Sequence, residues 1–379
     1  MHPQSLSPSA TTALRTLLVR GSSSRIGLAR ATGLTPGGVT RAVQPLIKRG
    51  LVTEDATLAG VGRGRPAQSL SVVADRELQV GVKVTASELI SVVCDLRCNV
   101  LAQRTEPLRN QAPEAVSHHL AAVIAAWRES FPAIVRVGVA ISGDVDSHRG
   151  QVGYSPFLGW RDVPLGHLVA ARTGLHVVVE NDVRALLTGE HLFGARSSAE
   201  SLAMVTIGAG IGCALLLQGR VVRSSRGVLG EIGHVLADSS GPMCHCGNIG
   251  CVEAIAGEAA IVSSLARRGY PNLDIHQVLE MARADHPAAR EVLAEAGRAI
   301  GIGLATLANL FGPAVIVLTG EAVGGPDGDY EVMEPSIRET FAQRAFGSAA
   351  DCELVLQPLG LADWARGAAA CAVAELVTL

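Results

Sequence analysis

The sequence of 379 residues predicts a multidomain protein, with an N-terminal winged helix-turn-helix followed by an α/β body of two actin-like or RNase H-like lobes. The first observation is a basic head with the helix pattern of that motif. The second is an alternation of strands and helices over the rest of the chain, and the third is a three-strand opening that occurs twice in it. We expect domains at 1–75, at 76–183 joined by 362–379, and at 184–361.

Composition indicates a globular protein with more than one hydrophobic core. Apolar residues make up 48% of the chain, and its length exceeds the ~250–300 residues at which single cores stop growing. No apolar run approaches the ~18 residues of a membrane span, and the polar N-terminus lacks the charged and apolar regions of a secretory signal. We therefore expect a cytoplasmic protein with no membrane partner.

Charge is distributed unevenly along the chain. Residues 1–75 hold nine basic and three acidic side chains, a net charge of +6, which leaves −9 for the remainder of a chain whose total is −3. A basic head on an acidic body predicts that only the head binds a polyanion. The basic residues of the head are Arg15, Arg20, Arg25, Arg30, Arg41, Lys48, Arg49, Arg63 and Arg65.

Three helices are expected in the head, at 12–20, at 25–32 and from Pro36 onward. The third begins with Thr35 as N-cap and with Pro36 at the first position, where a missing N–H costs nothing. Pro45 lies inside this helix, so we expect a bend there. The outward residues are small, polar or basic, which suits a recognition helix in a major groove. These candidate DNA contacts are Thr35, Gly37, Gly38, Thr40, Arg41, Gln44 and Lys48.

Two strands, at 50–54 and 68–73, flank the glycine- and arginine-rich loop 60–66 and form the expected wing. Its Arg63 and Arg65 suit a narrow minor groove, where the negative potential is strong. The alternative is a three-helix protein-interaction module with a solvated basic loop. We favour double-stranded DNA, an inverted-repeat operator bound by a homodimer or tetramer, because motif, wing and charge agree.

Beyond residue 75 two similar series of elements follow each other. Strands of the first lobe are expected at 78–84, 89–94, 99–104, 135–141 and 176–180, with a helix at 114–129. Strands of the second lobe are expected at 202–207, 213–218, 220–224 and 314–318, with a long helix at 289–310. This approximate duplication predicts two lobes that face each other across a cleft, and a final helix at 362–377 that returns to the first lobe.

One imidazole and three thiols between residues 230 and 258 have the spacing H-x9-C-x-C-x4-C. They are His234, Cys244, Cys246 and Cys251. Incidental buried cysteines are the alternative, but three cysteines within eight residues of a glycine-rich loop are not typical of packing, and a disulfide is not expected without a secretory signal. The set matches a closed tetrahedral site, so we predict a structural Zn²⁺.

These residues also carry a family resemblance. The segment GEIGH at 230–234 followed by CHCGNIGCVE at 244–253 resembles the signature of the ROK family, which comprises repressors, open reading frames and sugar kinases. The head, including the GRGRP wing at 62–66, resembles the winged helix of ROK repressors. The resemblance covers most of the chain and implies a sugar-kinase fold for the two lobes.

The resemblance also implies a sugar site. Asn181 and Asp182 are similar to the family's sugar-binding Asn and to the Asp that acts as general base, here a vestigial base candidate. Gly143 stands in the loop that lines the sugar. A surface cluster of acidic residues is the alternative. The full set of expected sugar contacts is Gly143, Asn181, Asp182, Glu231, His234 and Glu253.

The first phosphate loop departs from the family pattern. ROK kinases have an Asp-x-Gly-Gly-Thr-like turn after the first strand, whereas this chain has Lys83 at the Asp position and Ala86-Ser87 in place of the glycines. The second glycine loop, at 207–212, is preserved, although a short glycine cluster is weak evidence alone. Without the first turn Mg·ATP lacks its anchor, so we do not expect ATP or Mg²⁺ as a cofactor.

We therefore expect a sugar-responsive transcriptional regulator, a repressor, with a catalytically silent sensor and no enzymatic activity. Two alternatives belong to other classes. One is an ATP-dependent ROK sugar kinase that also binds DNA, and the other is a DNA-bound scaffold that takes no ligand. The turnover of ATP separates the first pair, and a thermal shift induced by a sugar separates the second.

Overall fold

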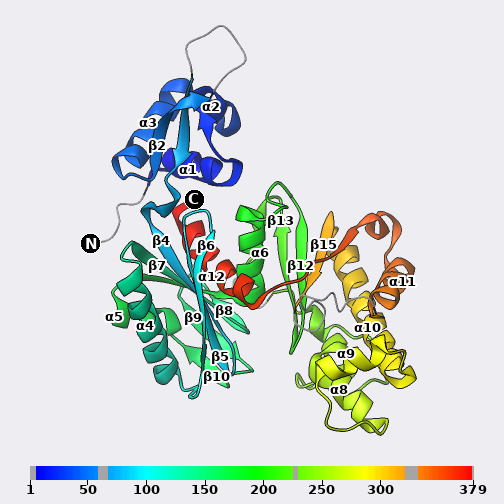
Figure 1. The fold of residues 1–379 in the computed structure, drawn as a ribbon. Helices are drawn as coiled ribbons and strands as arrows, with labels where there is room; N and C mark the ends of the chain where they lie inside the picture. The colour runs from blue at the N-terminus through cyan, green and yellow to red at the C-terminus, as the bar shows by residue number, and fades with distance from the viewer. Residues whose placement is uncertain (1–5, 59–66, 225–228, 321–331, 378–379) are drawn as a thin grey trace. The chain divides into compact units, whose positions relative to one another are not determined.

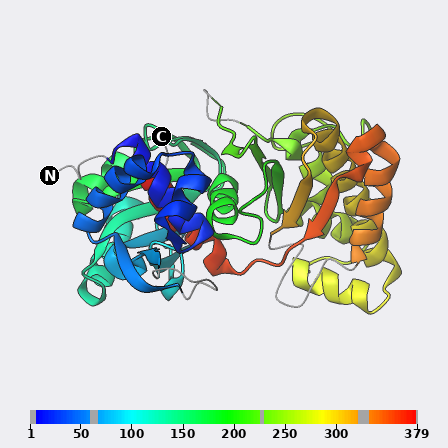
Figure 2. The same ribbon diagram turned by 90° about the horizontal axis from the view of Figure 1, so that it is seen from above.

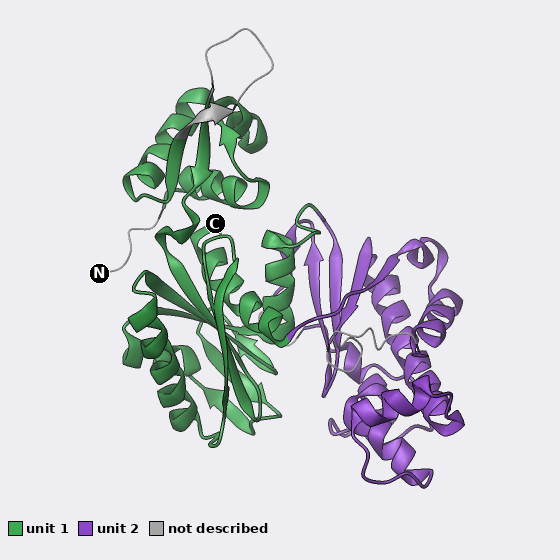
Figure 3. Cartoon of the chain, in the orientation of Figure 1, with its two compact units in different colours: residues 1–198, 361–379 green, residues 199–360 purple. Residues whose placement is uncertain are grey.

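The computed structural model describes residues 6–58, 67–224, 229–320 and 332–377. The chain folds as two compact units (Figure 3). Unit 1 comprises residues 1–198 and 361–379, and unit 2 comprises residues 199–360. Among the described residues, no helix is both long and apolar enough to cross a membrane.

The N-terminal part of unit 1 contains three helices and an antiparallel sheet in the order β1-β3-β2 (Figure 1). This is the element order that the sequence predicts for a winged helix-turn-helix, with β2 and β3 as the strands of the wing. The residues at the tip of the expected wing, Arg63 and Arg65, lie outside the described part of the chain. The elements are α1 (Pro8–Arg20), β1 (Ser23–Ser24), α2 (Arg25–Thr32), α3 (Pro36–Lys48), β2 (Val52–Leu58) and β3 (Ala67–Val72).

Side-chain caps fix where these helices begin. The hydroxyl of Ser7 accepts the N–H of Ala10 at 3.3 Å, and α1 therefore starts four residues earlier than expected. The hydroxyl of Thr35 accepts the N–H of Gly38 at 3.1 Å, as the expected N-cap requires. Pro45 is exposed and does not end α3, which continues for three more residues.

A five-stranded sheet in the order β11-β7-β4-β5-β6 forms the body of unit 1. Its first three strands in sequence make an antiparallel meander, and β7 and β11 run parallel to β4. A small sheet, β8-β9-β10, is absent from the sequence prediction. The elements are η1 (Ala74–Arg76), β4 (Leu78–Val84), β5 (Glu88–Cys94), β6 (Val100–Pro107), α4 (Pro113–Ser130), β7 (Ile134–Ile141), β8 (Asp144–Asp146), β9 (Gln151–Ser155), β10 (Trp160–Val163), α5 (Leu165–Thr173), β11 (His176–Asn181), α6 (Asp182–Phe193) and α12 (Leu361–Val377).

Helices cover both faces of this sheet. On one face α4 and α5 share a hydrophobic core with β4 and β7, and on the other face α12 lies directly against the strands (Figure 1). Gly81 and Gly138 make this contact possible, because a Cβ at either position would lie 1.9 or 1.8 Å from a backbone oxygen of α12. The chain therefore returns to unit 1 at its C-terminus.

Unit 2 repeats the topology of unit 1. Its sheet has the order β14-β13-β12-β15-β16, with an antiparallel meander followed by two parallel strands. In Figures 1 and 2 its helices lie on one side of that sheet, where α10 joins them to the strands in one hydrophobic core. The elements are β12 (Leu202–Ile207), β13 (Ile211–Leu217), β14 (Arg220–Val221), η2 (Ile232–His234), α7 (Val252–Ala256), α8 (Glu258–Arg267), α9 (Ile275–Arg283), α10 (Pro287–Phe311), β15 (Val315–Thr319), α11 (Glu334–Arg344), η4 (Gly347–Asp351) and β16 (Glu353–Leu356).

The shared strand order confirms the predicted duplication of an actin-like α/β lobe. The first unit extends further along the chain than the expected boundary at residue 183. This difference arises because α6 packs closely on α12 within unit 1. The linker to unit 2 therefore lies after α6, at residues 198–199.

Candidate functional site

Parallel pairing of β7 with β11 brings together the residues at the carboxyl ends of these strands. Ser142 and Gly143 follow β7, Asn181 ends β11, and Asp182 begins α6. Gly143 has a φ of +121°, and a Cβ there would lie 2.2 Å from the carbonyl oxygen of Tyr154, so the loop requires glycine. Three of the six expected sugar contacts thus form one cluster in unit 1.

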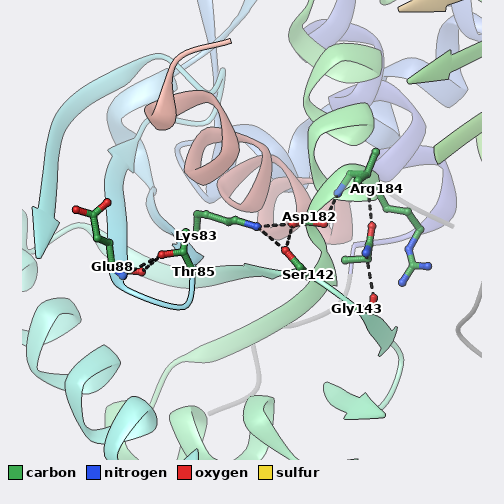
Figure 4. A network of polar contacts seen from close by, with 9 residues as sticks. Lys83, Thr85, Glu88, Ser142, Gly143, Asp182 and Arg184 are labelled. Carbon is green, nitrogen blue, oxygen red and sulfur yellow. Dashed lines mark hydrogen bonds and ion pairs between the residues drawn. The ribbon is translucent and has the colours of Figure 1, made fainter. Parts of the chain in front are cut away.

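Both carboxylate oxygens of Asp182 are engaged by neighbouring groups (Figure 4). Its Oδ2 accepts hydrogen bonds from the ammonium group of Lys83 and from the hydroxyl of Ser142 at 2.5 Å, and its Oδ1 accepts the N–H of Val183 at 2.9 Å. Burial alone would raise the pKa of this carboxyl, but the charge and hydrogen bond of Lys83 hold the pKa below its ordinary value. Asp182 is therefore ionised and poorly suited to accept a proton.

The side chain of Asn181 is bonded at both ends. Its Oδ1 accepts the N–H of Arg184 at 3.1 Å and so caps α6, and its Nδ2 donates to the carbonyl of Gly143 at 3.0 Å. Beneath it, a buried ion pair joins the guanidinium of Arg184 to Glu180 at 2.7 Å. This pair, which the sequence pattern does not predict, fixes the junction between β11 and α6.

Lys83 occupies the position where the family resemblance implies an Asp. Its side chain is only 7% exposed, in a strand that is buried along its whole length. The ammonium group bonds Asp182, donates to Ser142 Oγ at 3.1 Å, and lies 4.9 Å from the centre of the Trp364 ring. A buried ammonium group is stable only with such partners. The positive charge of Lys83 and the negative charge of Asp182 cancel, so the cluster is a charge-neutral network.

The turn between β4 and β5 is closed by a side chain instead of by glycine. The hydroxyl of Thr85 accepts the backbone N–H group of Ser87 at 3.2 Å. It also accepts the N–H group of Glu88 at 2.9 Å (Figure 4). In a phosphate-binding turn such amides point at the ligand. Here they are bonded within the turn.

The His/Cys cluster lies in unit 2, in the loop between η2 and α7. The ligand atoms of His234, Cys244, Cys246 and Cys251 all lie within 4.8 Å of one another, so these four residues could hold a metal ion. Burial raises the pKa of the Cys251 thiol to about 12. A bound cation would lower this pKa and favour the thiolate that a metal site needs.

The spacing of the cluster matches tetrahedral coordination. Bonds of about 2.3 Å to sulfur and 2.0–2.1 Å to nitrogen would place two sulfurs ~3.8 Å apart and a sulfur and a nitrogen ~3.6 Å apart. The Sγ atoms of Cys246 and Cys251 lie 3.7 Å apart, and Cys244 Sγ lies 3.6 Å from His234 Nδ1. These two separations therefore agree with the ligation of one tetrahedral ion.

The other two expected sugar contacts of unit 2 lie beside this cluster. Glu253 Oε2 accepts the N–H of Ile211, in the second glycine loop, at 2.7 Å, and Oε1 lies 2.6 Å from His245 Nε2. Glu231 is half exposed, 4.0 Å from the Nε2 atom of His234. The contact of His245 is not predicted from the sequence, although its position between two cysteine ligands could have suggested it.

In the head, the candidate DNA contacts share the outer side of α3. Thr35, Gly37, Thr40, Arg41, Gln44 and Lys48 are exposed, and Gly38 is half-buried. The opposite side of the helix buries Val39, Val43 and Leu46 in the core of the head. An apolar side thus anchors α3 and presents its polar side to solvent.

Comparison with known proteins supports this assignment of elements. Residues 79–375 match the ROK family. The chain is 33% identical to the DNA-binding transcriptional dual regulator NagC of Escherichia coli K12 over 314 residues, which is 79% of this chain and 77% of NagC. It is 26% identical to the xylose repressor of Bacillus subtilis 168 over 352 residues, 92% and 90% of the two chains.

Two solved structures match different extents of this chain. A ROK family transcriptional regulator, a homolog of the E. coli MLC protein, has a TM-score of 0.85 at 26% identity and covers 98% of this chain and 97% of its own. A ROK glucokinase from Streptomyces griseus, in complex with glucose and AMPPNP, has a TM-score of 0.68 at 28% identity and covers 78% and 99%.

The fold and the site thus define a duplicated α/β body with a helix-turn-helix head. The chain belongs to the ROK family. The regulator match spans the head, whereas the glucokinase match leaves about a fifth of this chain uncovered.

The ion pair in this site generates a prediction about stability. Lys83→Met should destabilise unit 1 by ~3–5 kcal/mol, because Asp182 is left buried without its partner. Adding Asp182→Asn to that variant should recover most of the loss. Urea unfolding of both single variants and the double variant at pH 7 measures the coupling, and additive effects would contradict a direct interaction.

Proposed function

We propose that this protein is a sugar-responsive transcriptional repressor, acting in the cytoplasm, whose kinase-like body senses a sugar without phosphorylating it. The observation that carries this proposal is the fusion of a helix-turn-helix head to a sugar-kinase-like body in which Lys83 engages the base candidate Asp182. Relatives named as an N-acetylglucosamine repressor and a xylose repressor agree with it.

DNA recognition is assigned to the head. The exposed side of α3 supplies Arg41 and Lys48, and the wing adds Arg63 and Arg65. A recognition helix reads one half-site, so a homodimer or tetramer presents two heads to an inverted repeat. The net charge of +6 on residues 1–75 supports contacts with phosphates.

The residues assigned to effector recognition form one group within each unit. Gly143, Asn181 and Asp182 contribute from unit 1, and Glu231, His234 and Glu253 contribute from unit 2. Amide, carboxylate and imidazole groups supply the directional donors and acceptors that a sugar's hydroxyls need. The position of the first group at the carboxyl ends of parallel strands is where α/β sheets bind ligands.

Phosphoryl transfer is disfavoured by two features. The turn amides of Ser87 and Glu88 are bonded to Thr85 instead of being free for phosphate. A fixed ammonium group stands where Mg²⁺ coordination needs a carboxylate, and it lowers the pKa of Asp182. The second glycine loop and Asp182 itself favour the competing hypothesis, a sugar kinase that also binds DNA.

The metal is assigned as Zn²⁺ with a structural role. Three thiolates and an imidazole leave no open position, which is the ligand set of a structural site. The ion would hold His234 beside Glu231 and the loop that precedes Glu253. It would thereby position the sugar contacts of unit 2 without taking part in chemistry.

Zinc content tests this metal assignment. Purified protein should contain about one zinc per chain, and Cys246→Ser should lower that content and the melting temperature, because metal binding contributes to folding. Cys352→Ser, at a half-buried cysteine outside the cluster, is the matched control and should retain zinc. Elemental analysis gives the result, and a wild-type protein without near-stoichiometric zinc would contradict the site.

DNA binding and its response to sugar test the regulatory function. A duplex selected from a random pool should contain an inverted repeat, and N-acetylglucosamine, xylose or glucose, or a phosphate ester of one of them, should weaken its binding ~5- to 150-fold. Arg63→Ala with Arg65→Ala should weaken binding and reduce its salt dependence, because fewer counterions are released. Fluorescence anisotropy measures both. The function is wrong if none of these ligands alters the melting temperature or operator affinity.

Turnover of ATP separates the repressor from the kinase. Each sugar of the panel, mixed with Mg·ATP and the protein, should release no ADP above the background of a Lys83→Met/Asp182→Asn variant, because phosphate and magnesium lack their anchors. A coupled ADP assay with a ROK glucokinase as positive control provides the measurement. Sugar-dependent ADP release at an enzyme-like rate would contradict the proposed silent sensor and favour the hypothesis of a sugar kinase.

A further inference from the structure

The chain contains two lysines among its 32 basic residues. Lys48 is exposed on α3, whereas Lys83 is buried in β4. A lysine is almost never fully buried unless it is paired. Lys83 is therefore buried because its ammonium group contacts three partners. These partners show which segments of the chain Lys83 connects.

The partners of Lys83 come from three other segments of unit 1. Asp182 is the first residue of α6, Ser142 follows β7, and Trp364 lies in the first turn of α12. Figure 4 shows the ammonium group directed at Asp182 and Ser142. One side chain thus fixes the first turns of two helices against the sheet.

These two helices are in direct backbone contact. A Cβ on Gly367 of α12 would lie 2.8 Å from the carbonyl group of Ala185 in α6, and the nearest atom to the Cβ position of Gly189 is the Cα of Gly367, at 3.4 Å. Such close approach leaves no space for one helix to slide without the other. We therefore treat α6 and α12 as one rigid pair.

The other ends of the pair contact the head. His191 in α6 lies 3.1 Å from a guanidinium nitrogen of Arg15 in α1, and burial together with that charge lowers the pKa of His191, so a neutral ring accepts the bond. Val373 and Val377 of α12 are part of the hydrophobic core of the head. The same two helices therefore connect the Lys83 cluster with the DNA-binding elements.

A sugar at Asp182 has to compete with these contacts. Lys83 and Ser142 bond Oδ2, and the N–H of Val183 bonds Oδ1. A hydroxyl that donates to Oδ2 would weaken the bond from Lys83, because an acceptor with more donors is shared among them. Binding of a sugar at Asp182 would then weaken the contact by which Lys83 fixes the first turn of α6.

We propose that Lys83 is a positioning residue that holds α6 and α12 in the arrangement that binds operator DNA, and that a sugar bound at Asp182 displaces its ammonium group and so releases the head. This inference rests on the proposed function and specifies how its regulation works. A ligand shifts such an equilibrium only through different affinities for the two arrangements, and competition for Asp182 supplies that difference.

Lysine reactivity tests the displacement directly. The full-length protein is treated briefly with an N-hydroxysuccinimide ester of acetic acid, with and without N-acetylglucosamine, xylose or glucose, and peptides are quantified by mass spectrometry. Lys83 should be protected without sugar and should react at least ~10-fold faster with the sugar that releases DNA, as an opened site exposes buried groups. Lys48 is the internal control and should react equally in both samples. A Lys83 rate that is unchanged or lower with that sugar overturns the proposal.

Variants test the consequence for DNA. Lys83→Met/Asp182→Asn, which leaves no buried charge, should bind operator at least ~10-fold more weakly without sugar, and Lys83→Arg should retain the affinity of the wild type. Arg97→Met, which lies outside the cluster, is the matched control. If the double variant binds operator and releases it with sugar as the wild type does, Lys83 has no positioning role.

The repressor function and the role of Lys83 are contradicted by different results. If no sugar of the panel alters the melting temperature or operator affinity of the wild type, the proposed function fails and this inference falls with it. If a sugar releases operator while Lys83 stays protected, the repressor function stands and the role of Lys83 is wrong.

Discussion

Unit 1 depends on the close packing of α12 against the five-stranded sheet, α6 and the head. This helix contributes to three hydrophobic clusters: one with β5, one with β7, β11 and α6, and one with the head. Its buried face consists mostly of alanine and glycine, and the strands beneath it supply Gly81 and Gly138. Small residues on both surfaces let the backbones come into contact. Close packing of the backbones therefore stabilises this interface without large side chains. The head, the sheet and α6 are therefore held by residues that are ~180 or more positions away from them in sequence.

Much of the fold could be predicted from the sequence because its elements are strongly patterned. The strand at 78–84 has the predicted bounds, and the helix at 289–310 is extended by only two residues at its start and one at its end. The small sheet β8-β9-β10 escaped prediction, since strands of three to five residues carry too little periodicity. The extent of unit 1 beyond residue 183 depends on packing between α6 and α12, which no local pattern encodes.

Spacing and family resemblance predict the members of the candidate site, but only some of the contacts that these residues make. Spacing alone predicts the four side chains that could hold a metal ion, because a short loop confines them. Lys83 departs from the family pattern in the sequence, but its bond to Asp182 spans 99 positions and depends on the pairing of β4 with β7. His245 likewise acquires its contact with Glu253 only when the loop is folded. The sequence therefore specifies which chemical groups are present, and the fold determines which of them are paired.

The pairing of Asp182 has a chemical consequence that the residue list alone conceals. In phosphoryl transfer a divalent cation arrives with the nucleotide and leaves with it, so the charge near the base varies through the cycle. Here the cation is part of β4, and its ammonium group forms a neutral pair with Asp182 without any nucleotide. The ammonium group of Lys83 keeps Asp182 ionised and oriented, so the carboxylate stays a hydrogen-bond acceptor while its affinity for a proton is lowered. Under the proposed function, Lys83 in place of an Asp would therefore favour sugar recognition over catalysis, as a sensor built on a kinase fold requires.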